Sequence, residues 1–488
     1  MRALDLVIVF AYLAGVVAAG VFFARRQKTT RQYFLGGRQI PWWAVSASIV
    51  ATETSTITFI SVPGIMFASD GDFAFLQLVF GYLLGRVAIS VLLIPSYFRG
   101  ELLTVYQLLQ MRFGGAVKAL AASLFVVMRT VADGVRLLLT AFVLAAVYRA
   151  FSGVETLDTV VVGSVLVIGV VMILFTFFGG MEAVIWIEVV QLGIYILGAV
   201  AAAAVLLQKI PGGWETVAAL GETYGKFQLF HFELDFAKPF TFWAGLIGGC
   251  FLTMSTHGTD QYLVQRYLCT NSPGKARAAL LTSGGVVLLQ FTGFLLIGLL
   301  LFAFYRPFEA GGASLSGDRV FPDFITQHLP PGLSGLVVAA IFAAAMSSSL
   351  NSIAATAVSD LYRPLVPNRS DRHYLDISRG LTVLAGIAQI GVALGIRQSA
   401  RSALDTALSI ASLLNGPVLG VFLLGAFSRR AGTPAALAGM GAGLAAVLAL
   451  RFGTSVAWPW YTFVGSLTTL LAGSLAGLAS RREAKGVA

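Results

Sequence analysis

The sequence predicts an all-α polytopic membrane protein with about thirteen transmembrane helices. Of its 488 residues, 57% are hydrophobic and only 11% are charged, which is more apolar surface than a water-soluble core can hide. Hydropathy windows of about 19 residues divide this surface into separate apolar segments. The 53 glycines agree with this class, because small residues let membrane helices approach closely. Each segment is predicted to be a helix, since backbone polar groups in lipid must be satisfied within the segment.

The predicted spans follow one another through mostly short connections. They cover residues 4–24, 42–68, 73–98, 116–149, 156–178, 182–208, 241–268, 277–305, 332–361, 374–396, 403–427, 433–451 and 457–479. The first span is not a cleaved signal, because its basic cluster follows the apolar run. The net charge of +10 lies between the spans, so it does not indicate a nucleic-acid partner.

The distribution of Lys and Arg orients the chain in the membrane. Basic residues gather in alternate loops, at 25–38, 99–118, 266–277, 363–372 and 429–430, and in the tail at 481–485. The opposite loops hold fewer basic residues, and one contains the acidic sequence SDGD at 69–72. By the positive-inside rule, the amino terminus is predicted outside and the carboxyl terminus in the cytoplasm, with the protein in the plasma (inner) membrane.

Two predicted spans are interrupted by polar residues. SIVATETSTITFIS (48–61) carries seven hydroxyl groups and the carboxylate of Glu53, and an ionisable group at this depth indicates a functional site. GGCFLTMSTHGTDQYLVQ (248–265) repeats the pattern five spans later, so the two helices cross in opposite directions. Two inverted halves with broken helices are typical of transporters whose site lies at the bilayer midplane. The alternative is that the hydroxyls only join packed helices.

One further charged pattern lies inside a span. Arg129, Asp133 and Arg136 are spaced i, i+4, i+7 and therefore share one helix face. They form either an internal ladder of salt bridges, which could include Glu53, or a site where an arginine binds the carboxylate of an organic anion. Arg86 is expected to extend towards the cytoplasmic face.

Other function classes lack their motifs. Two cysteines, Cys250 and Cys269, and four scattered histidines indicate neither a disulfide framework nor a metal centre. HExxH and GxSxG motifs are absent, so an enzyme is not expected. No filter loop of a channel is evident. A membrane sensor would be expected to add a signalling domain, whereas the sequence ends a few residues past the last span.

Several segments in order resemble the sodium:solute symporter family. They are YFLGGRQIPWWAVSASIVATETSTITFIS (33–61), GRVAISVLLIPSYFRGELLTVYQLLQMRFG (85–114), FTFFGGMEAVIWIEVVQ (175–191), GTDQYLVQRYL (258–268), SSSLNSIAATAVSDLYRP (347–364) and GPVLGVFLLGAF (416–427). The resemblance implies a LeuT-type fold in a single transporter domain, 1–485. Its parts would be an extra helix (4–24), two inverted five-helix repeats (42–208 and 241–427) and two final helices (433–479).

The resemblance also implies a function. It implies sodium-coupled symport of a small polar solute or organic anion into the cell by alternating access, with Na⁺ as the coupling ion. The partners would be the solute and the lipid bilayer, with no obligatory protein partner. The alternatives are a proton-coupled or uncoupled transporter of the same fold, or a membrane solute sensor.

The sodium ligands follow from the same resemblance. Ala51 and Thr54 match the carbonyl pair of the first broken helix. AAAMSS (343–348) matches the ninth-span pattern and would add the carbonyl of Ala344 with the hydroxyls of Ser347 and Ser348. Counting back from Asn351 without a gap instead places Ser347 and Ser348 at a second sodium site, with Glu188 as its carboxylate. Both registers place the two serines beside a cation.

The substrate site would lie between the broken helices. Positions matched to sugar-carrying relatives are Glu53, Thr58, Gln77 and Thr253, whereas Ile57 replaces a polar residue of those relatives and argues against a sugar. Spacing alone adds Thr56, Thr256, His257, Ser412 and Asn415. Arg136 joins them if the charged face at 129–136 binds the carboxylate of an organic anion. His257 either binds substrate or satisfies a neighbouring carbonyl. Asp260 is expected to orient the end of a half-helix.

Overall fold

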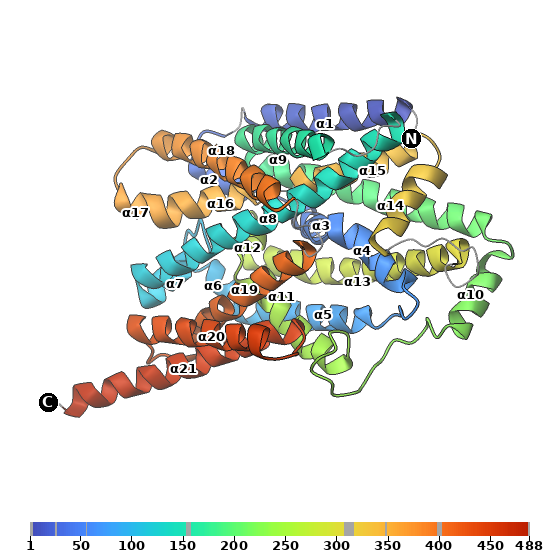
Figure 1. Ribbon diagram of the computed structural model, residues 1–488. Coiled ribbons are helices and arrows are strands. Elements are labelled where there is room, and N and C mark those ends of the chain that lie inside the picture. Colours follow the sequence, from blue (N-terminus) through green and yellow to red (C-terminus); the bar gives the residue numbers. More distant parts are fainter. Residues whose placement is uncertain are drawn as a thin grey trace.

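The computed structural model describes residues 3–24, 27–54, 56–152, 158–306, 317–346, 349–397 and 403–486. Within these ranges every regular element is a helix (Figure 1). The first half contains α1 (Ala3–Ala24), α2 (Thr30–Leu35), η1 (Gly36–Arg38), α3 (Trp42–Glu53), α4 (Thr56–Phe67), α5 (Phe75–Leu92), α6 (Ile94–Tyr97), α7 (Gln107–Phe113), α8 (Gly115–Ser152), α9 (Asp158–Lys209) and α10 (Gly213–Thr223). The second half contains η2 (Ala244–Gly248), α11 (Gly249–Gly258), α12 (Gln261–Leu268), α13 (Pro273–Tyr305), α14 (Gly317–His328), α15 (Leu333–Met346), α16 (Leu350–Thr356), η3 (Ala357–Tyr362), α17 (Arg363–Leu365), α18 (Asp371–Ile396), α19 (Ala403–Phe427), α20 (Thr433–Gly453) and α21 (Pro459–Gly486).

The predicted spans coincide with these helices. In the described part of the chain, eight helices are each long and apolar enough to cross a membrane, and α3 with α4 forms a further pair bent by 56°. Other predicted spans are chains of shorter helices: 241–268 contains η2, α11 and α12, and 332–361 contains α15, α16 and η3. The polar interruptions predicted from sequence therefore fall where helices end and restart.

Two predicted spans are joined in the 52-residue helix α9, which turns at Gly180. Its backbone there has φ 55° and ψ −166°, a conformation that only glycine adopts without strain. A Cβ at this position would lie 2.7 Å from the side-chain amide of Gln27. Gly180 lies between the predicted spans 156–178 and 182–208, so it separates them as the hydropathy pattern requires.

The loops rich in basic residues lie at one end of the helices. Arg38 Nη2 donates to the Leu102 carbonyl at 2.8 Å, and Arg112 donates to the Ser428 carbonyl. At the opposite end, Arg397 pairs with Asp158 at 3.1 Å. These contacts agree with the prediction that the loops rich in Lys and Arg alternate with loops poorer in basic residues along the chain. Figure 1 shows α20 and α21 beside each other at the edge of the bundle, with α1 at the opposite edge.

Candidate functional site

The first interrupted helix breaks after Glu53. Thr54 leaves the helical conformation (φ −76°, ψ 61°), and α4 begins at Thr56. A helix end leaves carbonyl groups without intrahelical donors, and nearby hydroxyls satisfy some of them here. Thr58 Oγ1 donates to the Glu53 carbonyl at 3.0 Å, whereas the Val50 carbonyl accepts both the Thr54 N–H at 2.9 Å and the Thr54 hydroxyl at 2.7 Å. Thr54 Oγ1 also reaches Gln290 Oε1 of α13 at 2.9 Å, which fixes the break against a neighbouring helix.

The second interrupted helix breaks between Gly258 and Gln261. Asp260 is the N-cap of α12, and its carboxylate accepts the Tyr262 N–H at 2.9 Å. The other carboxylate oxygen lies 2.5 Å from Arg129 Nη2 of α8. A side-chain acceptor at this position satisfies an N–H group that the helix start leaves open. The prediction that Asp260 orients the half-helix is therefore confirmed.

The carboxylate of Glu53 connects the two breaks. Its Oε2 lies 2.5 Å from Arg86 Nη2 of α5, and its Oε1 lies 2.8 Å from His257 Nε2 at the end of α11. The His257 Nδ1 lies 3.0 Å from Thr256 Oγ1. His257 thus contacts a carboxylate, whereas sequence reasoning offered substrate or a carbonyl. The three side chains join α3, α5 and α11 at the level of the breaks.

Arg86 corrects one expectation. Sequence analysis expected its side chain to reach the cytoplasmic face, but only 1% of the side chain is exposed. Two features keep it inside: the opposite charge of Glu53, and the space that Gly284 of α13 provides. A Cβ at Gly284 would lie 2.9 Å from Arg86 Cδ. Because Gly284 has no side chain, the Arg86 side chain fits between α5 and α13 instead of extending along the lipid.

The charged face of α8 is paired internally. Arg129 contacts Asp260, and Arg136 Nη1 lies 3.4 Å from Asp133 Oδ1. Asp133 Oδ2 accepts the backbone N–H of Ser349 at 3.1 Å and its hydroxyl as well. Of the predicted ladder, the pair of Arg136 with Asp133 is present, whereas Arg129 pairs with Asp260, and Glu53 pairs with Arg86 and His257. The guanidinium carbons of Arg129 and Arg136 lie 4.4 Å and 6.0 Å from the centre of the Tyr262 ring, within or at the limit of cation–π range.

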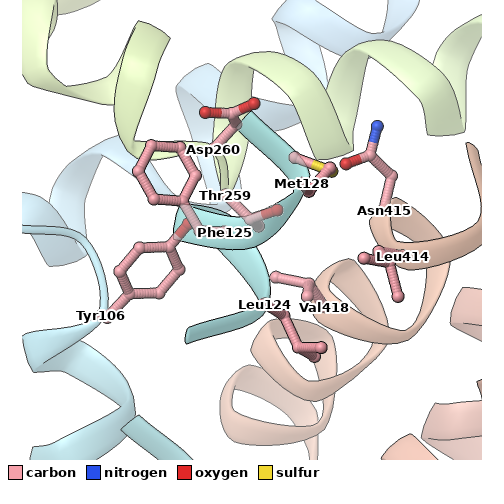
Figure 2. A pocket seen from close by; sticks show the side chains of 9 residues that line it. All are labelled: Tyr106, Leu124, Phe125, Met128, Thr259, Asp260, Leu414, Asn415 and Val418. Carbon is pink, nitrogen blue, oxygen red and sulfur yellow. The ribbon is translucent and has the colours of Figure 1, made fainter. Parts of the chain in front are cut away.

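A pocket opens beside the second break (Figure 2). Side chains from α8, α19, the break and the segment before α7 line it: Tyr106, Leu124, Phe125, Met128, Thr259, Asp260, Leu414, Asn415 and Val418. Figure 2 shows Tyr106 and Phe125 on one side, facing Leu414 and Asn415 on the other. Of the predicted substrate residues, Asn415 lies in this pocket. The Ser255 hydroxyl donates to the Asn415 carbonyl at 2.9 Å, so α11 and α19 are tied together at this level.

The remaining predicted substrate residues are distributed over the breaks and the outer end. Gln77 Nε2 donates to the Phe240 carbonyl at 3.0 Å, and its Oε1 accepts the His231 N–H at 3.1 Å. Both ends of this amide are therefore engaged by the loop before η2. Thr253 is buried against α5. A Cβ added at Gly85 of that helix would lie 2.8 Å from the Cβ of Thr253.

Part of the predicted sodium site lies outside the described residues. Ala51 is buried in the last turn of α3, and Ala344 lies in the last turn of α15. Ser347 and Ser348 are not among the described residues, and neither are the side chains of Thr56 and Ser412. α12 contacts both α3, which carries Ala51, and α16, the helix that follows Ser347 and Ser348 in the sequence.

Glu188 has partners that sequence reasoning missed. Its carboxylate contacts the hydroxyls of Ser48 and Thr52 and the guanidinium of Arg266. The i, i+4 spacing of the two hydroxyls on α3 was a signal that they share a face. Arg266 was counted with the loop charges, but it is fully buried.

Comparisons with known proteins give a consistent assignment. The model of the "Sodium:solute symporter family" matches residues 33–443. A sodium/sialic acid symporter of Aliivibrio fischeri is 32% identical, over 97% of this chain and 92% of that protein. A second one, from Proteus mirabilis, is 31% identical over 96% and 93%. The solved structure of a Na⁺-coupled sialic acid symporter, substrate-bound and outward-open, superposes with a TM-score of 0.87 at 29% identity, covering 98% of both chains.

These similarities extend over almost the whole chain, so they cover the helical architecture as well as the motifs. The protein is a multi-pass membrane transporter with a LeuT-type fold, and its activity is sodium-coupled symport of a small solute. The family resemblance, the all-α fold and the sodium coupling predicted from sequence are confirmed. The chain belongs to the sodium:solute symporter family.

Proposed function

We propose that this chain carries an organic acid of the sialic acid class into the cell together with sodium. Similarity to the two sialic acid symporters along 96–97% of the chain supports this substrate class. The protein would lie in the plasma membrane, with its amino terminus outside and its carboxyl terminus in the cytoplasm. The clustering of basic loops at one end of the bundle supports this orientation.

Arg136 carries the argument for an acidic substrate. Arg129, on the same face of α8, is held 2.5 Å from Asp260, whereas Arg136 lies 3.4 Å from Asp133. The other oxygen of Asp133 is engaged by Ser349. A planar guanidinium such as that of Arg136 is suited to a substrate carboxylate, which it would bind through two parallel hydrogen bonds.

The rest of the proposed substrate site lies at the two breaks and on the adjacent helices. Its members are Glu53, Thr56, Thr58, Gln77, Thr253, Thr256, His257, Ser412 and Asn415. The contacts of Glu53 with His257, and the pocket beside Asn415, support a site between α3, α11 and α19.

The coupling sodium is proposed to bind between α3 and the junction of α15 with α16. Its ligands would be the carbonyls of Ala51, Thr54 and Ala344 and the hydroxyls of Ser347 and Ser348. A hard cation prefers such oxygen ligands. The break after Glu53 supports the proposal, because carbonyls freed at a helix end can face an ion.

Alternating access follows from the same arrangement. The proposed repeats, 42–208 and 241–427, each contain a broken helix, α3–α4 and α11–α12. Sodium would order the first break and complete the substrate site, and closure of the outer side would precede opening of the inner side.

Uptake by purified protein in liposomes tests the substrate. Radiolabelled sialic acid is expected to accumulate under an inward sodium gradient but not under an equal potassium gradient. Its methyl ester, which lacks the carboxylate charge, is expected to compete poorly. Arg136→Gln is expected to abolish uptake, whereas Arg397→Gln, which breaks an exposed pair with Asp158, should not. Uptake that is unchanged in Arg136→Gln, or full competition by the ester, would refute the role of Arg136.

A further inference from the structure

The connection between α10 and η2 lies at the edge of the bundle (Figure 1) and carries apolar side chains at alternate positions. In FHFELDF (230–236) every second residue is Phe or Leu, and the residues between them are polar. Residues 228–235 contain no helix. The rings of Phe230 and Phe232 stack with their centres 5.5 Å apart, so side chains at i and i+2 lie on the same side, as in an extended chain. We call residues 228–236 the strap.

The polar side of the strap is fixed to the bundle through His231. Its Nε2 lies 2.6 Å from Asp72 Oδ2, and its backbone N–H donates to Gln77 Oε1 at 3.1 Å. Its carbonyl accepts the Phe242 N–H at 2.8 Å. The middle of the strap is therefore held against the start of α5 and against the segment that leads into η2.

Both ends of the strap are fixed as well. The Gln228 carbonyl accepts the Phe73 N–H at 3.0 Å, and the Phe236 carbonyl accepts the Ala457 N–H at 2.7 Å. The Phe236 ring also lies 5.2 Å from the ring of Trp460 at the start of α21. The strap thus extends from the start of α5 to the start of α21 in a defined position, so the orientation of its apolar side is defined too.

The apolar side of the strap is exposed. The exposed fractions are 61% for Phe232 and 66% for Leu234, and Phe230 and Phe236 are exposed as well. The exposed indole of Trp243 adjoins them, because its Nε1 donates to the Phe232 carbonyl at 3.3 Å. An apolar patch that is rimmed by polar residues marks an interaction surface.

The patch continues a surface that faces lipid. The Phe230 ring lies 6.3 Å from the ring of Phe80 on α5, a helix long and apolar enough to cross a membrane. Phe80 shares one face of α5 with Leu84, Val87 and Val91, which are spaced i+4, i+7 and i+11 and are all exposed. Exposed apolar side chains along a membrane span contact lipid, so the strap prolongs this face beyond the first turns of α5.

We propose that the strap lies in the headgroup region of the bilayer and inserts Phe230, Phe232, Leu234 and Phe236 between the lipids. Aromatic side chains are favourable at this depth of a membrane. Glu233 and Lys238, which pair at 3.2 Å, would stay in contact with water. The leaflet is the outer one in the orientation proposed above, and the contact with lipid does not depend on which solute is carried.

Nitroxide labels on single cysteines test this placement in liposomes. The native Cys250 and Cys269 are buried, so an exposed cysteine is labelled selectively. Labels in Phe232→Cys and Leu234→Cys are expected to collide more with oxygen, which dissolves in the bilayer, than with a water-soluble nickel chelate. The opposite preference is expected for Glu233→Cys, and for Glu101→Cys, whose native side chain is 81% exposed and serves as the reference in water.

The same labels identify the other possible occupants of the patch. Nickel access at 232 and 234 equal to that at 101 would overturn the proposal, because the patch would then face water. Dipolar broadening between labels would also overturn it and would indicate a second copy of the chain. Low access to both reagents would show that the rings are covered by the protein itself, with the same consequence. Sodium-driven uptake by the unlabelled liposomes is measured separately, so its failure would concern the proposed function and not the strap.

Discussion

Lys226 Nζ donates to the carbonyl of Met66, at 3.1 Å, beyond which α4 ends. It also donates to the carbonyls of Ala68 and Ser69 and lies 4.1 Å from the centre of the Phe302 ring. A cation is favourable at a helix carboxyl end. The loop after α10 therefore holds the end of the first broken helix through one side chain.

This contact predicts a pH dependence. Burial disfavours the charged amine and lowers the pKa of Lys226 from 10.5 to about 8. Between these values the unfolded chain binds more protons than the folded chain, so this group makes the free energy of unfolding rise with pH. The melting temperature of wild type minus that of Lys226→Met is expected to increase from pH 8 towards pH 10.5. A difference that falls over this range would contradict the burial of the charged amine.

Glu53 and Arg86 form a second testable pair. Loss of one member of a buried ion pair costs about 3–5 kcal/mol, so Glu53→Gln and Arg86→Gln are each expected to lower thermal stability clearly. The double variant is expected to lose less than the sum, because neither charge is left alone. Melting curves in detergent give the three values. The exposed pair of Arg31 and Glu101 is the control, with an expected contribution of about 0–1 kcal/mol. Additive losses at Glu53 and Arg86 would show that the two side chains are not coupled.

Gly180 predicts a backbone effect inside α9. Ala at φ 55° and ψ −166° is strained by about 1–3 kcal/mol, and its Cβ would also meet Gln27. Gly180→Ala is therefore expected to destabilise the protein. The matched control is Gly163→Ala on the same helix, where a Cβ would meet nothing within 4 Å. An equal melting temperature for the two variants would contradict the turn.

Asp260 combines two roles that substitutions can separate. Asp260→Asn keeps an oxygen that can cap α12 but removes the charge opposite Arg129, whereas Asp260→Ala removes both. The loss of an N-cap costs about 0.5–2 kcal/mol. The expected order of stability is wild type, then Asn, then Ala, measured by thermal unfolding. An Ala variant as stable as the Asn variant would show that capping contributes little.

Much of the fold follows from composition and periodicity. The length and apolar character of the spans predict the helices, and the polar interruptions at 48–61 and 248–265 predict where two of them break. These features are local in the chain. The turn at Gly180 falls between the predicted spans 156–178 and 182–208, because hydropathy separates segments even when a helix continues across the junction.

The partners of buried charges could not be predicted in the same way. Arg86 meets Glu53 only because Gly284, far along the chain, leaves room between α5 and α13. Arg266 looked like a loop charge because it lies near the end of its predicted span, yet the fold brings Glu188 to it. Such pairings depend on how helices pack, which a hydropathy window does not contain.

The hydroxyls of Ser347 and Ser348 give the last prediction. If they bind the coupling sodium, Ser347→Ala/Ser348→Ala removes two of its oxygen ligands, and oxygen is the ligand that this hard cation prefers. The sodium concentration for half-maximal solute uptake is then expected to rise strongly, while the melting temperature without sodium stays close to that of wild type. Ser352→Ala is the control, because this hydroxyl lies on the neighbouring helix α16 and donates to Gln265 Oε1 at 2.7 Å. An unchanged sodium requirement in the double variant would exclude both hydroxyls from the sodium site and leave the carbonyls of Ala51, Thr54 and Ala344 as its remaining proposed ligands.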